Sequence, residues 1–255
     1  MVQGTLLPTV VGGTTGKAVA DCGASGSMAA APFGEAGRIT PALRTPRPPR
    51  LYAIADAETL GSTPVEEAVR IMAAEGVRWI QLRAKRLSDR ELCARAESCL
   101  RITTDAGAVL WINDRADVAA MLGAPALHLG QDDLPPEAAR MVVGEATWIG
   151  RSTHGEEQIA AAAADPEVDV VAVGPVYPTR TKARPDPVVG LELVRRGRAS
   201  TEKPLVAIGG ITAATALEVL AAGADTVAVA AAVCSGDISV NCRRLLAAVG
   251  GKDGR

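Results

Sequence analysis

A glutamine and two cations alternate along one short stretch, Gln81-Leu82-Arg83-Ala84-Lys85. In an extended strand, this alternation sends Gln81, Arg83 and Lys85 to the same side. Two cations and an amide that face one concavity form a receptor for a polyanion, because arginine makes forked contacts with oxygen atoms and lysine supplies a point charge. A basic surface loop is the alternative for this stretch taken alone.

Two carboxylates follow two later apolar runs. Asp114 closes Ile112-Asn113-Asp114, and Asp133 closes His128-Leu129-Gly130-Gln131-Asp132-Asp133. One or two carboxylates, completed by water and substrate phosphate, are the usual protein ligands of Mg²⁺. Each aspartate taken singly is also typical of a helix cap, since a helix is expected after both. The neighbouring cations favour the magnesium interpretation, because Mg²⁺ with arginine and lysine is what a diphosphate requires.

Hydroxyl groups, a further cation and small residues follow the remaining runs. In Gly150-Arg151-Ser152-Thr153-His154 the serine and histidine are two residues apart, a spacing that seldom lets them face each other, and the Gly-x-Ser-x-Gly elbow of hydrolases is absent. Pro178-Thr179-Arg180-Thr181-Lys182 offers hydroxyl donors and a cation on a loop over phosphate. Ile208-Gly209-Gly210-Ile211-Thr212 and Val229-Ala230-Ala231-Ala232 permit close backbone approach to a second phosphate.

Short apolar runs and helical segments alternate from Leu51 onward, and they must position these groups. The runs predict eight strands: Leu51-Ala55, Val77-Leu82, Val109-Asn113, Ala126-Leu129, Thr147-Gly150, Val168-Val173, Leu205-Ile208 and Thr226-Val229. Amphipathic segments lie between them, with Ser88 and Thr212 as candidate helix caps. This alternation predicts a single (β/α)8 TIM barrel, with an open doubly wound sheet as the weaker alternative. In a barrel, the polar groups above gather at the carboxyl ends of the strands.

Residues 1–48 differ from the rest of the chain because they are dominated by Gly, Ala, Ser, Thr and Pro. Such a segment buries too little apolar surface to offset its ordering entropy, so we expect a disordered extension. A mis-assigned start codon, a processed segment and a functional tail are the alternatives. The catalytic domain is expected at 49–250, and residues 251–255 are expected to form a flexible C-terminus.

The composition excludes several classes of protein. The formal net charge is -2, from 27 basic and 29 acidic residues, so the chain has no electrostatic footprint for nucleic acid. No apolar stretch approaches the length of a membrane span. Five cysteines without a CxxC pair indicate reduced thiols and a cytoplasmic protein. The sequence leaves the oligomeric state open and allows a homo-oligomer.

Six of these motifs, all except Val229-Ala230-Ala231-Ala232, together resemble the thiamine phosphate synthase family over about 51–250. The resemblance implies a transferase that condenses 4-amino-5-hydroxymethyl-2-methylpyrimidine diphosphate with 4-methyl-5-(2-hydroxyethyl)thiazole phosphate. The products would be thiamine phosphate and diphosphate, and the reaction would be dissociative, with diphosphate leaving first. A thiazole tautomerase-like barrel and a non-catalytic binder of thiamine precursors are the alternatives.

The resemblance also assigns site residues, motif by motif. It implies that Mg²⁺ is held by Asp114 and Asp133, and that Arg83, Lys85 and Lys182 act in catalysis by neutralising the departing diphosphate. The pyrimidine diphosphate would contact the stretch Gln81, Leu82, Arg83, Ala84 and Lys85 together with Asn113, Ser152 and Lys182. The thiazole phosphate would contact Thr179, Arg180, Thr181, Gly210, Ala230 and Ala231. The chain departs from the family pattern at Ala84, Arg115 and Ala231, where an acidic residue, a second Asp and a Ser are common.

Overall fold

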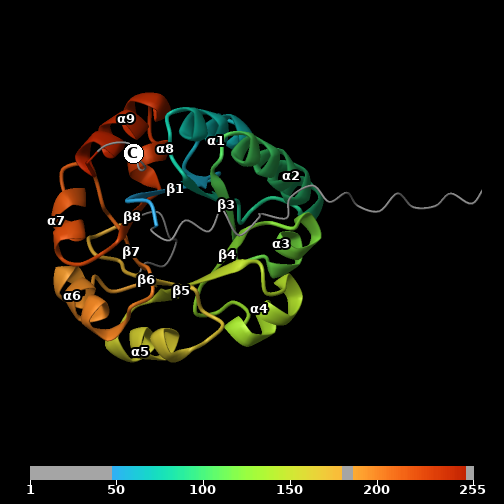
Figure 1. Cartoon of the computed structure of the whole chain (residues 1–255). Coiled ribbons are helices and arrows are strands. Elements are labelled where there is room, and N and C mark those ends of the chain that lie inside the picture. The colour runs from blue at the N-terminus through green and yellow to red at the C-terminus, as the bar shows by residue number, and fades with distance from the viewer. Residues whose placement is uncertain (1–47, 180–185, 251–255) are drawn as a thin grey trace, which may run out of the picture. The chain divides into compact units, whose positions relative to one another are not determined.

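Eight parallel strands close into a barrel in chain order within residues 48–179 and 186–250, the part of the chain that this computed structural model describes (Figure 1). The strands are β1 Leu51–Asp56, β2 Trp79–Arg83, β3 Val109–Asn113, β4 Ala126–Leu129, β5 Trp148–Thr153, β6 Val170–Val173, β7 Leu205–Ile208 and β8 Thr226–Val229. The predicted (β/α)8 barrel is therefore confirmed, and the open doubly wound sheet is wrong.

Helices form a ring around the outside of the barrel (Figure 1). They are α1 Val65–Ala74, α2 Asp89–Asp105, α3 Ala116–Leu122, α4 Pro136–Val143, α5 Glu156–Ala164, α6 Gly190–Ser200, α7 Ala216–Ala221, α8 Ala231–Cys234 and α9 Ile238–Ala248. A helix follows each strand, and β8 is followed by both the short α8 and the longer α9. In the described ranges, no helix combines the length and the apolarity that a membrane span needs.

The observed boundaries show which local signals were reliable. Ser88 caps α2 as predicted, because its hydroxyl accepts the N–H of Glu91 and the Glu91 carboxylate accepts the N–H of Ser88. The predicted cap at Thr212 is wrong, since α7 begins only after Thr215, whose hydroxyl accepts the N–H of Thr212. Strand β5 runs to Thr153, beyond the predicted end, because its polar half continues the pairing with β6.

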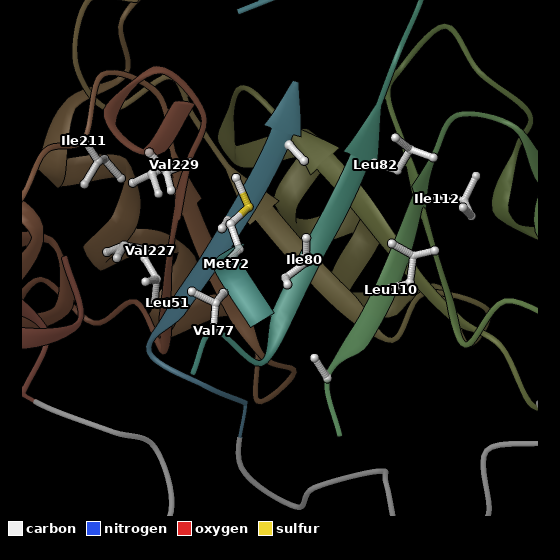
Figure 2. Close-up of a cluster of buried hydrophobic side chains, with 14 of the residues drawn as sticks. Leu51, Met72, Val77, Ile80, Leu82, Leu110, Ile112, Ile211, Val227 and Val229 are labelled. Carbon is white, nitrogen blue, oxygen red and sulfur yellow. The ribbon is translucent and has the colours of Figure 1, made fainter. Parts of the chain in front are cut away.

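The main hydrophobic core lies between the strands and the helix ring (Figure 2). Leu51, Ile80 and Leu110 come from three neighbouring strands and are almost completely buried, as is Met72 of α1. Because successive side chains of a strand point to opposite faces, the residues between them point into the barrel. Each strand therefore packs its outward side chains against the helices and its inward side chains inside the barrel.

Aromatic rings fill the inside of the barrel. Tyr52, Trp79, Trp111 and Trp148 contact one another, and the ring centroids of Trp79 and Trp111 are 4.9 Å apart. Trp79 and Trp148 are the first residues of their strands, so this cluster lies toward the amino-terminal end of the barrel. These rings fill the part of the barrel interior that lies toward the amino-terminal ends of the strands.

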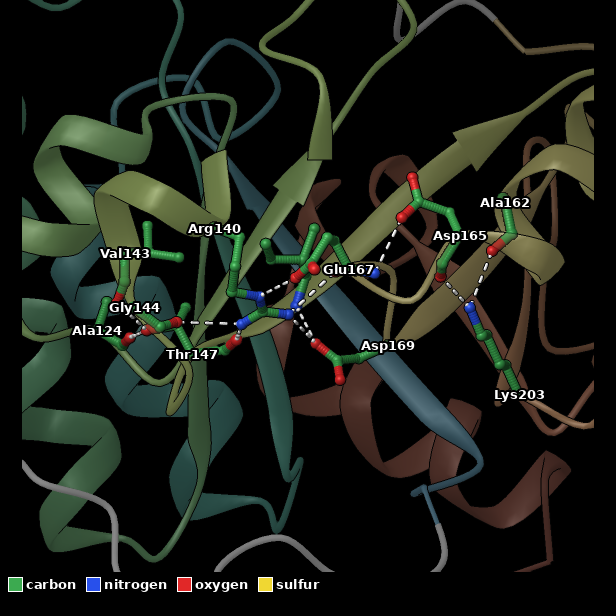
Figure 3. Close-up of polar contacts among 11 residues, drawn as sticks. Ala124, Arg140, Val143, Gly144, Thr147, Ala162, Asp165, Glu167, Asp169 and Lys203 are labelled. Carbon is green, nitrogen blue, oxygen red and sulfur yellow. Dashed lines mark hydrogen bonds and ion pairs between the residues drawn. The ribbon is translucent and has the colours of Figure 1, made fainter. Parts of the chain in front are cut away.

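A buried arginine ties strands together at the amino-terminal end of the barrel (Figure 3). Arg140 of α4 donates to the carboxylates of Glu167 and Asp169 at 2.9 Å each, and to the carbonyl of Thr147 at 2.5 Å. Asp169 also accepts the N–H of Ile149 at 2.8 Å. Every polar atom of this guanidinium thus has a protein partner, which is the condition for a buried charge to be tolerated.

A similar arrangement recurs two strands later. Arg198 of α6 donates to Asp225 at 2.8 Å, and Asp225 accepts the N–H of Leu205 at 2.8 Å. In both places an aspartate that precedes a strand joins a helix arginine to the backbone of the preceding strand. Polar networks at this end of a barrel stabilise the fold, whereas chemistry belongs at the opposite end.

Candidate active site

A cavity of about 140 Å³ lies at the carboxyl ends of the strands. Its walls carry the polar residues that end the strands, above a floor of apolar side chains that includes Ile54 and Val206. Eight of the predicted substrate residues line it: Gln81, Arg83, Asn113, Ser152, Thr179, Gly210, Ala230 and Ala231. The structure thus brings together motifs that are spread over 150 positions of the sequence.

Gln81 is fixed inside the barrel by its neighbour on β1. It is 3% exposed, and its Nε2 donates to the hydroxyl of Tyr52 at 2.7 Å. Burial raises the pKa of Tyr52 well above its usual value, so the phenol stays neutral. The amide of Gln81 therefore has a defined orientation at the cavity wall.

Arg83 reaches the cavity rim from the last position of β2. Its Nη1 atom contacts Asp56 Oδ1 at 2.5 Å and Glu58 Oε2 at 2.6 Å. The parallel register places Asp56 directly opposite Arg83. The guanidinium is thereby held beside the cavity with its charge already partly balanced.

Two carboxylates and a lysine meet beside this rim. Lys85 Nζ lies 2.9 Å from Asp114 Oδ2, and Asp133 Oδ2 accepts the N–H of Gly130 at 2.6 Å. Burial, and then contact with the Asp114 carboxyl, raises the pKa of Asp133. Two carboxyl groups so close together favour a bound proton or a cation between them.

The backbone at Asp114 adopts a left-handed conformation, with φ of 64°. Such a conformation is unusual for a residue other than glycine and is often found at functional sites. Neither carboxylate caps a helix, because the capping positions of α3 and α4 are Arg115 and Pro135. The helix-cap alternative is therefore wrong for both aspartates.

The donor set fits magnesium better than a transition metal. Within the described residues, no group of three or more His, Cys, Asp or Glu side chains could hold a metal ion. Two carboxylates beside a cavity, with the other positions left for water and substrate oxygen, match the way proteins hold Mg²⁺.

Several predicted residues lie away from the cavity wall. Leu82 and Ala84 are 1% and 8% exposed and pack into the core between strands and helices. A substrate contact from either would come through the backbone. The side chain of Lys85 is 53% exposed and sits beside Asp114, outside the cavity lining. Arg180, Thr181 and Lys182 lie outside the described residues.

The structure adds two histidines to the site. His128 Nε2 lies 2.9 Å from the hydroxyl of Ser152, and His154 Nδ1 lies 2.5 Å from the carbonyl of Gly174. Ser152 and His154 therefore have separate partners, as their spacing predicted. The alternation of β4 was the signal for His128, because it puts this residue on the inward face with Ala126.

The Gly209-Gly210 pair is required by protein packing. Gly209 has φ of 103°, and a Cβ atom there would lie 2.4 Å from Cα of Pro175. Gly210 has φ of 63°, and its Cβ would lie 2.5 Å from the carbonyl oxygen of Pro178. The glycines thus let the segment after β6 lie against the end of β7, which brings Thr179 to the cavity.

The described cysteines do not supply a nucleophile. Cys93, Cys99, Cys234 and Cys242 are free thiols. Burial raises the pKa of Cys99, Cys234 and Cys242 to about 12, which keeps them protonated. Their role is packing.

A closed (β/α)8 barrel with an arginine, a lysine and paired carboxylates at its mouth defines a barrel enzyme that handles phosphorylated substrates. Comparisons with known proteins narrow this class. A family model described as "Thiamine monophosphate synthase" matches residues 51–233. The chain belongs to this family.

Individual relatives agree with the family match. A thiamine-phosphate synthase of Koribacter versatilis is 46% identical over 187 residues, which are 72% of this chain and 88% of that protein. One of Methanoculleus marisnigri is 45% identical over 197 residues, covering 76% and 92%. The solved structure of a thiamine phosphate pyrophosphorylase from Pyrococcus furiosus is similar with a TM-score of 0.72 and 32% identity, covering 80% of this chain and 97% of that one.

Proposed function

We propose that this barrel condenses 4-amino-5-hydroxymethyl-2-methylpyrimidine diphosphate with 4-methyl-5-(2-hydroxyethyl)thiazole phosphate, releasing thiamine phosphate and diphosphate. The observation that carries the proposal is the convergence of Gln81, Arg83 and Ser152 on one cavity, beside the Lys85–Asp114–Asp133 group. The names of the similar proteins support the same activity. The enzyme is thus a transferase of thiamine biosynthesis.

The pyrimidine diphosphate is assigned to the side of the cavity formed by β2, β3 and β5. Gln81, Asn113 and Ser152 offer hydrogen bonds from the wall, and Arg83 offers charge at the rim. Lys85 adds a cation from beside Asp114, and Lys182, which lies outside the described residues, is assigned as a second cation. Leu82 and Ala84 contribute only through their backbone.

Magnesium is assigned to Asp114 and Asp133. When bound there, the ion would neutralise negative charge on the diphosphate as its bond to carbon weakens. The protein's own contribution is to hold two oxygen ligands close together in spite of their mutual repulsion. The pKa of Asp133 is raised by burial and then by the Asp114 carboxyl, and Lys85 opposes this shift only in part, so the pair favours a further cation.

The thiazole phosphate is assigned to the opposite side of the mouth. Thr179, Gly210, Ala230 and Ala231 line the cavity there, and Arg180 and Thr181 follow Thr179 in the chain. Ala231 offers a backbone N–H but no hydroxyl. Phosphate binding at this position uses backbone donors at the ends of β7 and β8, as in many barrels.

The reaction on these residues is dissociative. The bond between the pyrimidine methylene carbon and the diphosphate oxygen breaks, and its electron pair leaves with the diphosphate. The thiazole nitrogen then attacks the methylene cation. Fixed cations aimed at the leaving group lower this barrier, and no general base is needed. The apolar floor, including Ile54, Val206 and Ile208, keeps water from the cation.

Two alternatives to this activity are a thiazole tautomerase-like barrel and a non-catalytic binder of thiamine precursors. Neither alternative requires Gln81, Arg83 and Lys85 together with the two aspartates, Asp114 and Asp133. That set is complete in this chain: Gln81 and Arg83 line the cavity, and Lys85 pairs with Asp114 outside the cavity lining. Among the described residues, the four cysteines are free thiols, which fits a reducing cytoplasm, and a homo-oligomer stays a prediction.

The test is to incubate the purified protein with both phosphorylated precursors and Mg²⁺. Thiamine phosphate and diphosphate should form in equal amounts, and omission of either precursor or addition of EDTA should stop their formation. Absence of thiamine phosphate in the complete mixture would refute the proposal. Conversion of a thiazole tautomer without the pyrimidine would favour the tautomerase.

A further inference from the structure

Asp56 is a buried carboxylate that pairs with Arg83 of the cavity wall, and the proposed reaction does not use it directly. It is the last residue of β1 and is 0% exposed. Burial of a charged carboxylate is costly unless each oxygen is paired. The structure provides both pairs: Oδ1 contacts Arg83 Nη1 at 2.5 Å, and Oδ2 accepts the hydroxyl of Thr59 at 2.6 Å.

The backbone around Asp56 makes this carboxylate rigid. Its carbonyl accepts the N–H groups of Thr59 and Leu60 at 2.9 and 3.0 Å, and the next residue, Ala57, donates to the carbonyl of Arg83 at 2.8 Å. Asp56 and Arg83 also face each other in the β1–β2 register. The carboxylate is therefore fixed relative to the strand that carries Arg83.

Glu58 is a second carboxylate partner of Arg83, and it is more exposed than Asp56. Glu58 contacts the same Nη1 atom at 2.6 Å, but it lies on the turn after β1 and its side chain is 24% exposed. An exposed pair contributes little and exchanges with other ligands, whereas a buried one is maintained. Because both carboxylates contact the same nitrogen of Arg83, a substitution of Glu58 is a matched control for a substitution of Asp56.

We propose that Asp56 is the positioning residue for Arg83, holding its guanidinium at the cavity rim so that the remaining donors meet the substrate diphosphate. The proposal rests on the proposed function, because it assumes that Arg83 binds that group. Asp56 touches no reacting atom. It acts by fixing the arginine before the substrate arrives, which avoids the cost of ordering a long side chain on binding.

The test compares Asp56→Asn with Glu58→Gln. Asp56→Asn should lower kcat/KM for the pyrimidine diphosphate by about 10²-fold, the effect expected of a misplaced catalytic contact, and should weaken inhibition by inorganic diphosphate. The KM for the thiazole phosphate should not change. Glu58→Gln should alter these constants by less than about fivefold, as for an exposed pair.

A double-mutant cycle tests whether Asp56 acts through Arg83 or only stabilises the fold. In an Arg83→Met background, Asp56→Asn should cause little further loss of kcat/KM, because the group that it positions is absent. A full additional loss, or equal losses for both substrates, would overturn the proposal. Thermal unfolding of each variant identifies any that fail to fold.

A second measurement keeps the inference testable if the proposed activity fails. Calorimetric titration with inorganic diphosphate and Mg²⁺ needs no turnover. Weaker binding to Asp56→Asn than to Glu58→Gln would support the positioning role, and equal binding to both would overturn it. Lack of turnover by the unmodified chain would instead count against the proposed reaction alone.

Discussion

We expect the substitution Asp114→Asn to lower kcat strongly while it leaves the free energy of unfolding almost unchanged. Asn keeps the size of the side chain and tolerates the left-handed backbone at this position, where φ is 64°. Alanine would confuse the result, because an ordinary residue in that conformation costs about 1–2 kcal/mol. The substitution therefore removes a charge and little else.

The expected change in stability is small. Asp114 pairs with Lys85 at 2.9 Å, but the side chain of Lys85 is 53% exposed, so loss of the pair costs no more than about 1 kcal/mol. The pKa of Asp133 is raised first by burial and then by the Asp114 carboxyl, so loss of the Asp114 charge removes the second of these causes. We expect the free energy of unfolding, measured with urea, to change by less than about 1 kcal/mol.

The expected change in activity is large. Loss of one preorganised electrostatic contact to the leaving group lowers kcat by about 10²–10³-fold, and the Mg²⁺ concentration for half-maximal rate should rise. Steady-state assays of thiamine phosphate formation across a Mg²⁺ series measure both. Asp132→Asn, at an exposed neighbouring carboxylate, is the control and should behave as the unmodified protein. A kcat for Asp114→Asn near that of the control would refute the magnesium assignment.

Three further predictions follow from the fold. Arg140→Met should lower the free energy of unfolding by about 3 kcal/mol in urea titrations, because it removes a buried guanidinium that pairs with the partly buried carboxylates of Glu167 and Asp169, whereas the exposed Arg101→Met should cost less than about 1 kcal/mol; equal effects would contradict the network in Figure 3. Gly209→Ala should lower both the thermal midpoint and kcat/KM, because its Cβ would meet Cα of Pro175 at 2.4 Å, and an unchanged midpoint would show that this packing is unimportant. Deletion of residues 2–45 should leave kcat/KM unchanged, since the family match begins at residue 51, and a large loss would show that the extension is functional.

The fold could be predicted from sequence because strand and helix signals alternate regularly. The strands at 109–113, 126–129, 205–208 and 226–229 have the predicted bounds, since each is a compact apolar run. Strand β5 was misjudged because its second half is polar, and only its pairing with β6 shows that it is extended. The cap at Thr212 failed because α7 begins only after Thr215, which makes no side-chain capping bond, and the Thr215 hydroxyl instead accepts the N–H of Thr212 in the preceding turn.

The candidate site was predicted in outline and not in its supporting contacts. Alternation alone places Gln81 and Arg83 on one face. It does not show that Tyr52 and Asp56 hold them, because those contacts depend on the register between β1 and β2. Lys85 lies beside Asp114 and not in the cavity wall, since β2 ends at Arg83 and alternation no longer applies after it. The predicted roles of these residues stay predictions.

A crystal structure with thiamine phosphate, diphosphate and Mg²⁺ would test the central claim most directly. The claim is that the carboxyl ends of β2, β3 and β4 form the site that receives the departing diphosphate. Diphosphate should lie against Arg83 and Lys85, joined through the metal to Asp114 and Asp133. Diphosphate bound away from these residues, or a metal held elsewhere, would contradict the account.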